Sequence, residues 1–183
     1  MLQWLGPDHS TRVIHNDRRD GAFVSVVRHV DDGTERVLPM AVYTVNSAGT
    51  QALCIDNERH YWFRGGYNYQ GIQNVDKRKP LDERDGIWAM DLGTGATRQI
   101  INIMDLLAIE PLSTMRSGTH YLEHLMFSPS GRRFCFLHRW KMDDGGIYAR
   151  LFTTAADGSD IRLLSDSGRM SHYSWLDDER IIA

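Results

Sequence analysis

The apolar positions of this chain fall into short runs separated by polar turns, and several of these turns contain Asp-Gly or Ser-Gly pairs. Runs of alternating or clustered β-branched and aromatic residues between such turns predict β-strands. The clearest stretch covers residues 121–183, where an apolar strand, a Ser-Pro-Ser-Gly turn, an aromatic strand, an Asp-Gly turn and another strand complete one cycle. A second cycle then begins, with His-Tyr-Ser-Trp at 172–175 echoing His-Leu-Met-Phe at 124–127. This recurrence is typical of β-propeller blades.

Turn signals divide the chain into four such cycles. We expect blades at approximately 1–40, 41–103 and 121–165, and a truncated fourth blade at 171–183, all in a single partial propeller domain over 1–183. A blade buries its faces only against neighbouring blades, and roughly four to eight blades are needed to close a ring. The sequence therefore predicts an all-β fold, a partial β-propeller of about three and a half four-stranded antiparallel blades, read as a fragment of a longer protein.

Two segments depart from the strand pattern. Residues 57–84 form a long insertion in the second cycle that we expect to be irregular, and residues 103–109 give a short helical pattern that ends before Pro111. The insertion is rich in aromatic and guanidinium groups, which suit stacking on sugar faces and pairing with carboxylates. The alternative is that these aromatic side chains pack the insertion onto the blade beneath it.

Composition excludes several classes of protein. The chain has 183 residues, of which 42% are hydrophobic and 25% are charged, so it is neither disordered nor collagen-like, and it has no apolar run of membrane-spanning length. A net charge of −3 with scattered basic residues argues against nucleic acid as a partner. Cys54 and Cys135 lie in apolar runs, where cysteine usually acts as a small core residue. Because the start has no secretory signal, we expect a cytoplasmic protein, or a periplasmic one if Met1 is internal.

Three of the eight histidines lie at related points of the pattern. His124 and His172 each come three residues before an aromatic residue on an inner strand, and His138 lies near the end of the following strand. Equal offsets on neighbouring blades should make the first two imidazoles converge on the channel, whereas Glu123 should point away from His124. Converging imidazoles suit a transition-metal site or a general base. The alternative is that each imidazole binds a backbone group at a blade junction.

Several segments together resemble a known family. Residues 123–131 (Glu-His-Leu-Met-Phe-Ser-Pro-Ser-Gly), 134–140 (Phe-Cys-Phe-Leu-His-Arg-Trp) and 171–175 (Ser-His-Tyr-Ser-Trp) resemble the oligogalacturonate lyases and related lyase-like propellers. Residues 3–7 (Gln-Trp-Leu-Gly-Pro) and 64–69 (Arg-Gly-Gly-Tyr-Asn-Tyr) are also similar to a bacterial branch of that group. The resemblance implies a seven-bladed ring that cleaves uronate sugars by β-elimination.

The resemblance also implies roles for individual residues. His124 matches the catalytic base, and His172 matches a ligand of a manganese ion, or another divalent metal, whose remaining ligands would come from a later blade outside this chain. Arg64, Arg139 and Arg116 are candidates for holding the carboxylate of an acidic oligosaccharide, although surface arginines more often form ordinary ion pairs.

Other interpretations stay open beside the lyase. Tyr67 and Tyr69 are candidate substrate-binding residues even without catalysis. Where lyases often have Gly-His-Glu-Phe-Trp, this chain has Ser-His-Tyr-Ser-Trp at 171–175, so the sugar could differ. The Ser-Pro-Ser-Gly blade motif is shared with noncatalytic propellers such as the Tol-associated periplasmic protein, so the chain could bind a carbohydrate or protein partner without cleaving it. Open blade edges could also favour self-association.

Overall fold

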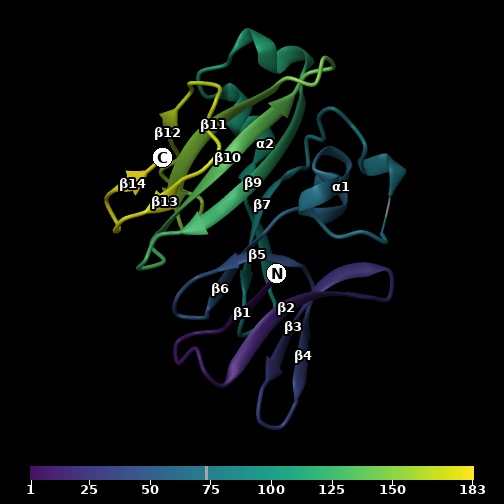
Figure 1. Ribbon diagram of the computed structural model, residues 1–183, viewed down its shortest axis with the longest axis vertical. Helices are drawn as coiled ribbons and strands as arrows, with labels where there is room; N and C mark the ends of the chain where they lie inside the picture. The colour runs from purple at the N-terminus through teal and green to yellow at the C-terminus, as the bar shows by residue number, and fades with distance from the viewer. Residues whose placement is uncertain (73) are drawn as a thin grey trace.

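The computed structural model describes residues 1–72 and 74–183, in which three four-stranded antiparallel sheets follow one another along the chain (Figure 1). The first sheet contains β1 (Leu2–Trp4), β2 (Arg12–Arg19), β3 (Ala22–His29) and β4 (Glu35–Leu38). The second contains β5 (Val42–Val45), β6 (Gln51–Cys54), β7 (Gly86–Asp91) and β8 (Thr97–Asn102). The third contains β9 (Thr119–Phe127), β10 (Arg133–Lys141), β11 (Ile147–Ala155) and β12 (Arg162–Ser165).

Each sheet is a meander in which every strand pairs with the next strand in the sequence. A short hairpin follows the third sheet, made by β13 (Ser174–Trp175) and β14 (Ile181–Ile182). Successive four-stranded meanders are the arrangement of propeller blades, so the chain is an all-β partial β-propeller, as the sequence predicted. The strands of the three sheets lie within residues 2–38, 42–102 and 119–165, and those of the hairpin within 174–182.

Three apolar clusters join the consecutive sheets. One cluster lies between the first and second sheets and includes Ile14, Val27, Val45, Ala52 and Met90. A second joins the second sheet to the third through Leu53, Ile87, Ile101, Phe134, Phe136 and Phe152. A third joins the third sheet to the C-terminal hairpin through Leu137, Leu151, Trp175 and Ile181. Because alternate residues of a strand face opposite sides of the sheet, each central sheet packs against a neighbour on both faces.

Both cysteines belong to this core, as expected. Cys54 and Cys135 are fully buried and free, and burial raises the pKa of each thiol to about 12. At neutral pH both thiols are therefore protonated and act as small apolar groups.

The expectation that the insertion is irregular was wrong. It contains a helix, α1 (Asn57–Phe63), and two short 3-10 turns, η1 (Gly65–Tyr67) and η2 (Val75–Lys77). Asp56 caps α1, because its side chain accepts a hydrogen bond from the backbone N–H of Arg59. The other predicted helix is confirmed as α2 (Ile103–Ala108), and a 3-10 turn, η3 (Ser113–Ser117), follows it. Among the described residues, no helix is long and apolar enough to cross a membrane.

The insertion is organised around one buried guanidinium group. Arg59 is 1% exposed, and its Nε donates to a carboxylate oxygen of Asp85 at 2.7 Å. Its terminal nitrogens donate to four backbone carbonyls, those of Lys77, Lys79, Pro80 and His120. A single side chain thus fastens α1, the end of the insertion and the start of β9 to one another.

Two buried imidazoles form a hydrogen-bonded chain inside the third blade. His120 and His138 stack with their ring centroids 5.2 Å apart, and His120 Nδ1 lies 3.0 Å from His138 Nε2. His120 Nε2 lies 2.8 Å from the carbonyl oxygen of Met115, and His138 Nδ1 faces a terminal nitrogen of Arg150 at 3.4 Å. These partners fix the direction of donation from Arg150 through His138 and His120 to Met115, with both rings neutral. His138 is therefore a core residue, whose neighbours are His120, Trp140 and Arg150.

Candidate functional site

The carboxylate of Glu123 is the centre of the most highly charged buried cluster among the described residues. Glu123 is on β9 and 1% exposed. Arg139 on β10 places its Nε 2.8 Å from Oε1, and Arg64 places its Nε 3.5 Å from Oε2. His60 Nε2 lies 3.4 Å from Oε2, and His124 Nδ1 lies 3.4 Å from Oε1. We call these five residues the Glu123 site.

Helix α1 and the residue that caps its C-terminus, Arg64, supply half of the partners of this carboxylate. His60 and Arg64 are four residues apart, so they lie on the same side of the helical segment. Helix α1 lies beside β9 (Figure 1), and the ring of Phe63 stacks on Tyr121 of that strand with a centroid distance of 6.4 Å. Asn68 orients His60 through a contact of 2.9 Å to its Nδ1, which leaves Nε2 as the donor toward Glu123. The insertion thus packs on the blade and contributes to the site as well.

The Glu123 site carries an excess of positive charge. Burial alone would raise the pKa of Glu123, but the contacts with His124 and His60 and the charge of Arg139 outweigh burial and lower it. The carboxylate is therefore ionised at neutral pH. Two guanidinium groups facing one carboxylate leave one positive charge, even with both imidazoles neutral. Arg64 is the accessible member of the pair, with 22% of its side chain exposed.

His124 has an unusual backbone conformation that is fixed from both sides. Its φ of 57° lies in the left-handed region, which few non-glycine residues adopt. The register between β9 and β10 shifts at this point, so the ladder is interrupted there. The backbone N–H of His124 donates instead to the hydroxyl of Tyr43 on β5 at 2.8 Å, and its carbonyl accepts from the hydroxyl of Tyr173. Neighbouring segments on both sides of the third blade therefore hold this residue.

The same irregularity corrects one expectation from the sequence. Glu123 does not point away from His124, because the two side chains lie within ion-pair distance. Strict alternation of side chains along a strand requires regular extended backbone, and the left-handed residue with its register shift removes that regularity.

The second histidine of the sequence pattern lies beside the first. The rings of His124 and His172 meet edge to face, with centroids 6.1 Å apart and an interplanar angle of 88°. Their side chains do converge, as equal offsets on neighbouring blades predicted. Nevertheless, residues 1–72 and 74–183 contain no group of three or more His, Cys, Asp or Glu side chains able to hold a metal. Glu123, which lies beside His124, is already engaged by two guanidinium groups, so a manganese ion bound by His172 stays a prediction that depends on ligands from another blade.

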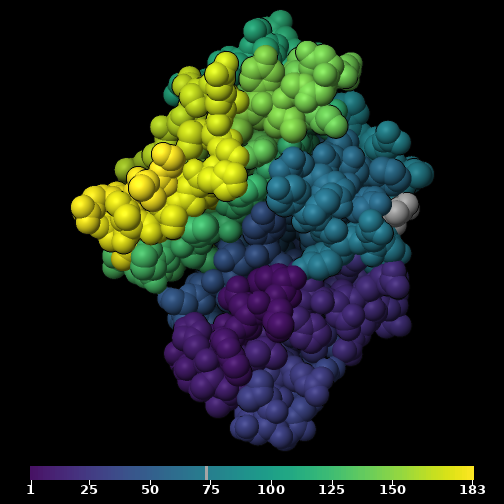
Figure 2. Space-filling model, in the orientation of Figure 1, coloured from purple at the N-terminus to yellow at the C-terminus, as the bar shows by residue number. Residues whose placement is uncertain are grey.

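The predicted tyrosines border a hollow next to the Glu123 site. A cavity of about 350 Å³ is lined by Tyr43, Tyr67 and Tyr69 among others, and Figure 2 shows this face hollowed between the insertion and the N-terminal strands. Tyr67 is exposed, and the guanidinium of Arg64 stacks 4.3 Å from its ring centroid. The hydroxyl of Tyr69 instead accepts from Asn16 and from the amino group of Met1. Tyr69 therefore anchors the insertion to the first blade.

The structure brings six of the seven predicted site residues into this neighbourhood. These are His124, His172, Arg64, Arg139, Tyr67 and Tyr69. Arg116 is the exception, because it lies on η3 and lines a different cavity together with Leu107 and Met115.

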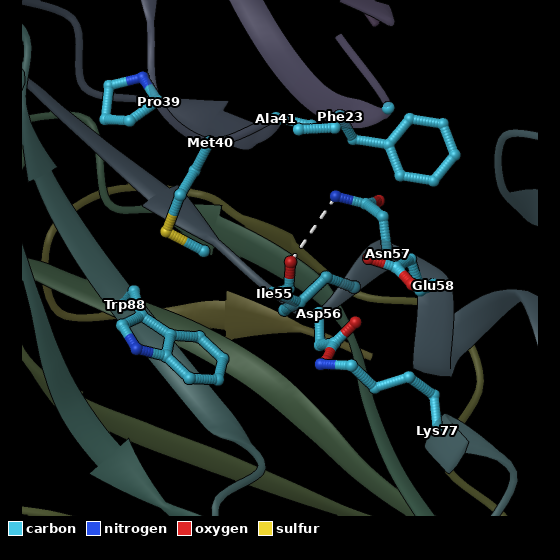
Figure 3. Close-up of a pocket in the computed structure, with 12 residues that line it drawn as sticks. Phe23, Pro39, Met40, Ala41, Ile55, Asp56, Asn57, Glu58, Lys77 and Trp88 are labelled. Atoms are coloured by element: carbon cyan, nitrogen blue, oxygen red, sulfur yellow. Dashed lines mark hydrogen bonds and ion pairs between the residues drawn. The ribbon is translucent and has the colours of Figure 1, made fainter. Parts of the chain in front are cut away.

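A third hollow, between the first and second blades, offers fewer free polar groups. Figure 3 shows the side chains of Phe23, Met40 and Trp88 around it. The ammonium group of Lys77 pairs with Asp56, and the amide of Asn57 lies 3.4 Å from the carbonyl oxygen of Ile55 (Figure 3). Most of its polar groups are thus satisfied within the protein.

Sequence reasoning missed Glu123 as the centre of the site and His60 as a member of it. It also missed Tyr43 and Tyr173, the two tyrosines that hold the backbone of His124. Two signals could have revealed the first two. Glu123 is the only acidic residue in the apolar strand 119–127, and a buried carboxylate requires cationic partners. His60 and Arg64 have helical spacing directly after Asp56, a favourable helix cap. The tyrosine contacts depend on backbone geometry that the sequence pattern does not encode.

Comparisons with known proteins support no closer assignment. No protein-family model matches the chain, and no curated protein matches it. A solved acylaminoacyl peptidase in complex with Z-Gly-Gly-Phe-chloromethyl ketone is similar over 89% of this chain and 24% of its own, at 9% identity and a TM-score of 0.46. TolB from Acinetobacter baumannii is similar over 90% of this chain and 43% of its own, at 10% identity and a TM-score of 0.41. The chain spans less than half the length of either neighbour.

Proposed function

We propose that this propeller module binds a carboxylate group of an acidic oligosaccharide at the Glu123 site, and that His124 can act there as the base of a β-elimination. The observation that carries the proposal is the positive excess around Glu123 directly beside a partly exposed imidazole, that of His124. The resemblance to oligogalacturonate lyases supports the same substrate class.

The binding step depends on Arg64. Only its Nε faces Glu123, and its terminal nitrogens have no partner among the described residues, so they are available to a ligand carboxylate. A guanidinium group binds a carboxylate through two parallel N–H donors, which favours uronate sugars over neutral ones. The exposed ring of Tyr67 beneath Arg64 gives the apolar face of a sugar a surface to pack on.

The chemical step depends on the orientation of His124. The carboxylate of Glu123 near Nδ1 favours the tautomer with its proton on that nitrogen, which leaves the lone pair on Nε2. In the proposed reaction Nε2 takes the proton from C5 of the uronate. The electron pair of that C–H bond forms a C4–C5 double bond, the C4–O bond to the next sugar breaks, and the leaving oxygen takes a proton from solvent. Neutralising the uronate carboxylate with Arg64 makes the C5 proton more acidic.

The test compares a trigalacturonate with a neutral trisaccharide of the same length. Calorimetry should show that only the acidic sugar binds and that Arg64→Gln weakens binding about tenfold or more, the effect of one charge-assisted contact. Arg98→Gln, a substitution of an exposed arginine on β8, serves as the matched control. Equal affinity for the acidic and neutral sugars would exclude acidic-sugar recognition.

A second measurement separates cleavage from binding. Elimination creates a conjugated double bond, which is followed by ultraviolet absorbance during incubation with trigalacturonate. His124→Ala should abolish the increase in absorbance and leave most of the affinity. Binding without any absorbance change in the unsubstituted chain would restrict the function to that of a noncatalytic binding module.

A further inference from the structure

The residue left outside the Glu123 site, Arg116, borders a separate apolar cavity. This cavity has a volume of about 440 Å³ and lies where the end of the insertion, α2 and η3 meet the start of β9. Leu81, Leu107, Leu112 and Met115 form most of its wall, and Pro111, Ser113, Arg116 and His120 complete it. None of the four apolar side chains belongs to the three core clusters that join the sheets.

The two largest polar side chains of the cavity wall, His120 and Arg116, differ in whether they have partners within the protein. His120 has a partner for each ring nitrogen, the carbonyl of Met115 and the ring of His138, so it presents no free donor or acceptor to the cavity. Arg116 is exposed and has no carboxylate partner within residues 1–72 and 74–183. The cavity therefore combines an apolar interior with one uncompensated positive charge at its rim.

We propose that this cavity binds a small amphipathic monocarboxylate, with its aliphatic chain against Leu81, Leu107 and Leu112 and its carboxylate on Arg116. The charge pattern supports an anion because a single guanidinium matches a single carboxylate. The size also agrees. At about 30 Å³ per heavy atom, the volume of a water molecule in the liquid, octanoate needs about 300 Å³, less than the cavity provides.

This site is independent of the proposed acidic-sugar site. It shares no residue with Glu123 or its partners, and its interior is apolar where the hollow near Tyr67 is bordered by hydroxyl groups. An aliphatic acid gains affinity from each buried methylene, whereas an oligosaccharide has no long apolar segment to bury.

The experiment is a calorimetric titration with octanoate, hexanoate and 1-octanol. Octanoate should bind about tenfold more tightly than hexanoate, since two methylene groups are removed from water. Arg116→Gln should weaken octanoate about tenfold or more and change the affinity for 1-octanol less than twofold. The matched control Arg98→Gln should leave both affinities unchanged.

A second variant tests where the aliphatic chain of the ligand binds. Leu107→Trp keeps the wall apolar and adds six heavy atoms, which take about 180 Å³ of the cavity at the same rate, so it should weaken binding of both octanoate and 1-octanol about tenfold or more while circular dichroism stays that of the unsubstituted protein. Unchanged octanoate binding in Leu107→Trp or in Arg116→Gln would overturn the proposal, because the ligand would then lie on another surface. Arg64→Gln should not affect octanoate, so failure here and failure of the acidic-sugar site are distinguished.

Discussion

Acidification should destabilise this protein through its buried pair of imidazoles. In the chain from Arg150 through His138 and His120 to Met115, every ring nitrogen already has a partner. An added proton on His138 Nδ1 would face the guanidinium of Arg150, and one on His120 Nδ1 would face the N–H of the other ring. Burial, followed by the charge of the other histidine and of Arg150, lowers the pKa of His138 well below its usual value of 6.5. Burial also lowers the pKa of His120.

The magnitude follows from the difference between the folded and unfolded chains. Because both rings bind fewer protons when folded, their contribution to the free energy of unfolding is complete above pH 6.5 and is lost as the pH falls. If a histidine stays neutral in the folded chain, the free energy of unfolding is lower by about 1.4 kcal/mol at pH 5.5, one pH unit below the pKa of histidine in the unfolded chain. His138 should supply this whole amount, and His120 a part of it.

One carboxyl group acts in the opposite direction. Burial raises the pKa of Asp85 to about 6, although Arg59 opposes the shift. Asp85 therefore binds more protons in the folded chain, and its contribution to stability is complete below pH 3.8 and is lost as the pH rises through about 6. Burial also raises the pKa of Glu58, and the pH dependence of the intact protein sums the contributions of all such groups, so the contribution of His138 must be measured by difference.

The assay is urea unfolding at pH 7.5 and pH 5.5, followed by tryptophan fluorescence, for which Trp140 next to His138 is a suitable reporter. His138→Gln removes the titrating ring and leaves Asp85 in place. Between the two pH values the unsubstituted protein should lose about 1.4 kcal/mol more than this variant. The control His9→Gln, at an exposed position, should behave as the unsubstituted protein. An identical pH dependence in His138→Gln would refute the reasoning.

Four further substitutions, of which Gly21→Ala serves as a control, test other parts of the structure by urea unfolding or spectroscopy. Glu123→Gln should lower the free energy of unfolding by about 3–5 kcal/mol, because it leaves the buried guanidinium group of Arg139 without its carboxylate; a loss under 1 kcal/mol would contradict the described burial. Tyr43→Phe should cost about 1 kcal/mol and shift the NMR signals of His124, whose backbone N–H loses its acceptor; unchanged signals would argue against that contact. Gly158→Ala should destabilise by several kcal/mol, since a Cβ there would lie 2.2 Å from a backbone carbonyl, whereas Gly21→Ala, with a positive φ but open space, should cost only about 1 kcal/mol; equal costs would refute the clash.

The strands could be predicted from the sequence because each one is bounded by turn residues and has a recognisable apolar pattern. Helix α1 was not predicted, because residues 57–63 lack the apolar pattern that indicated the helix at 103–108; the cap Asp56 and the spacing of His60 and Arg64 were its only signals. Its stability comes from tertiary contacts, above all those of Arg59 with Asp85 and four backbone carbonyls. The convergence of His124 and His172 followed from repeat position, but the role of Glu123 did not, because regular strand geometry stops at His124.

The two tyrosines that hold His124 have a consequence for the evolution of this propeller. Repeat proteins commonly change by duplicating, deleting or exchanging whole units, and a unit that keeps its contacts to itself survives such exchange. Here Tyr43 comes from the second blade and Tyr173 from the segment after the third, yet both bind the backbone of one residue of the third. If the second blade or the segment after the third blade were exchanged for another unit, the sequence would still contain His124, but the side chain would lose one of the two hydroxyl groups that fix its backbone. The conformation of this histidine is therefore a joint property of three consecutive segments, and an exchanged unit would have to supply an equivalent hydroxyl group to restore it.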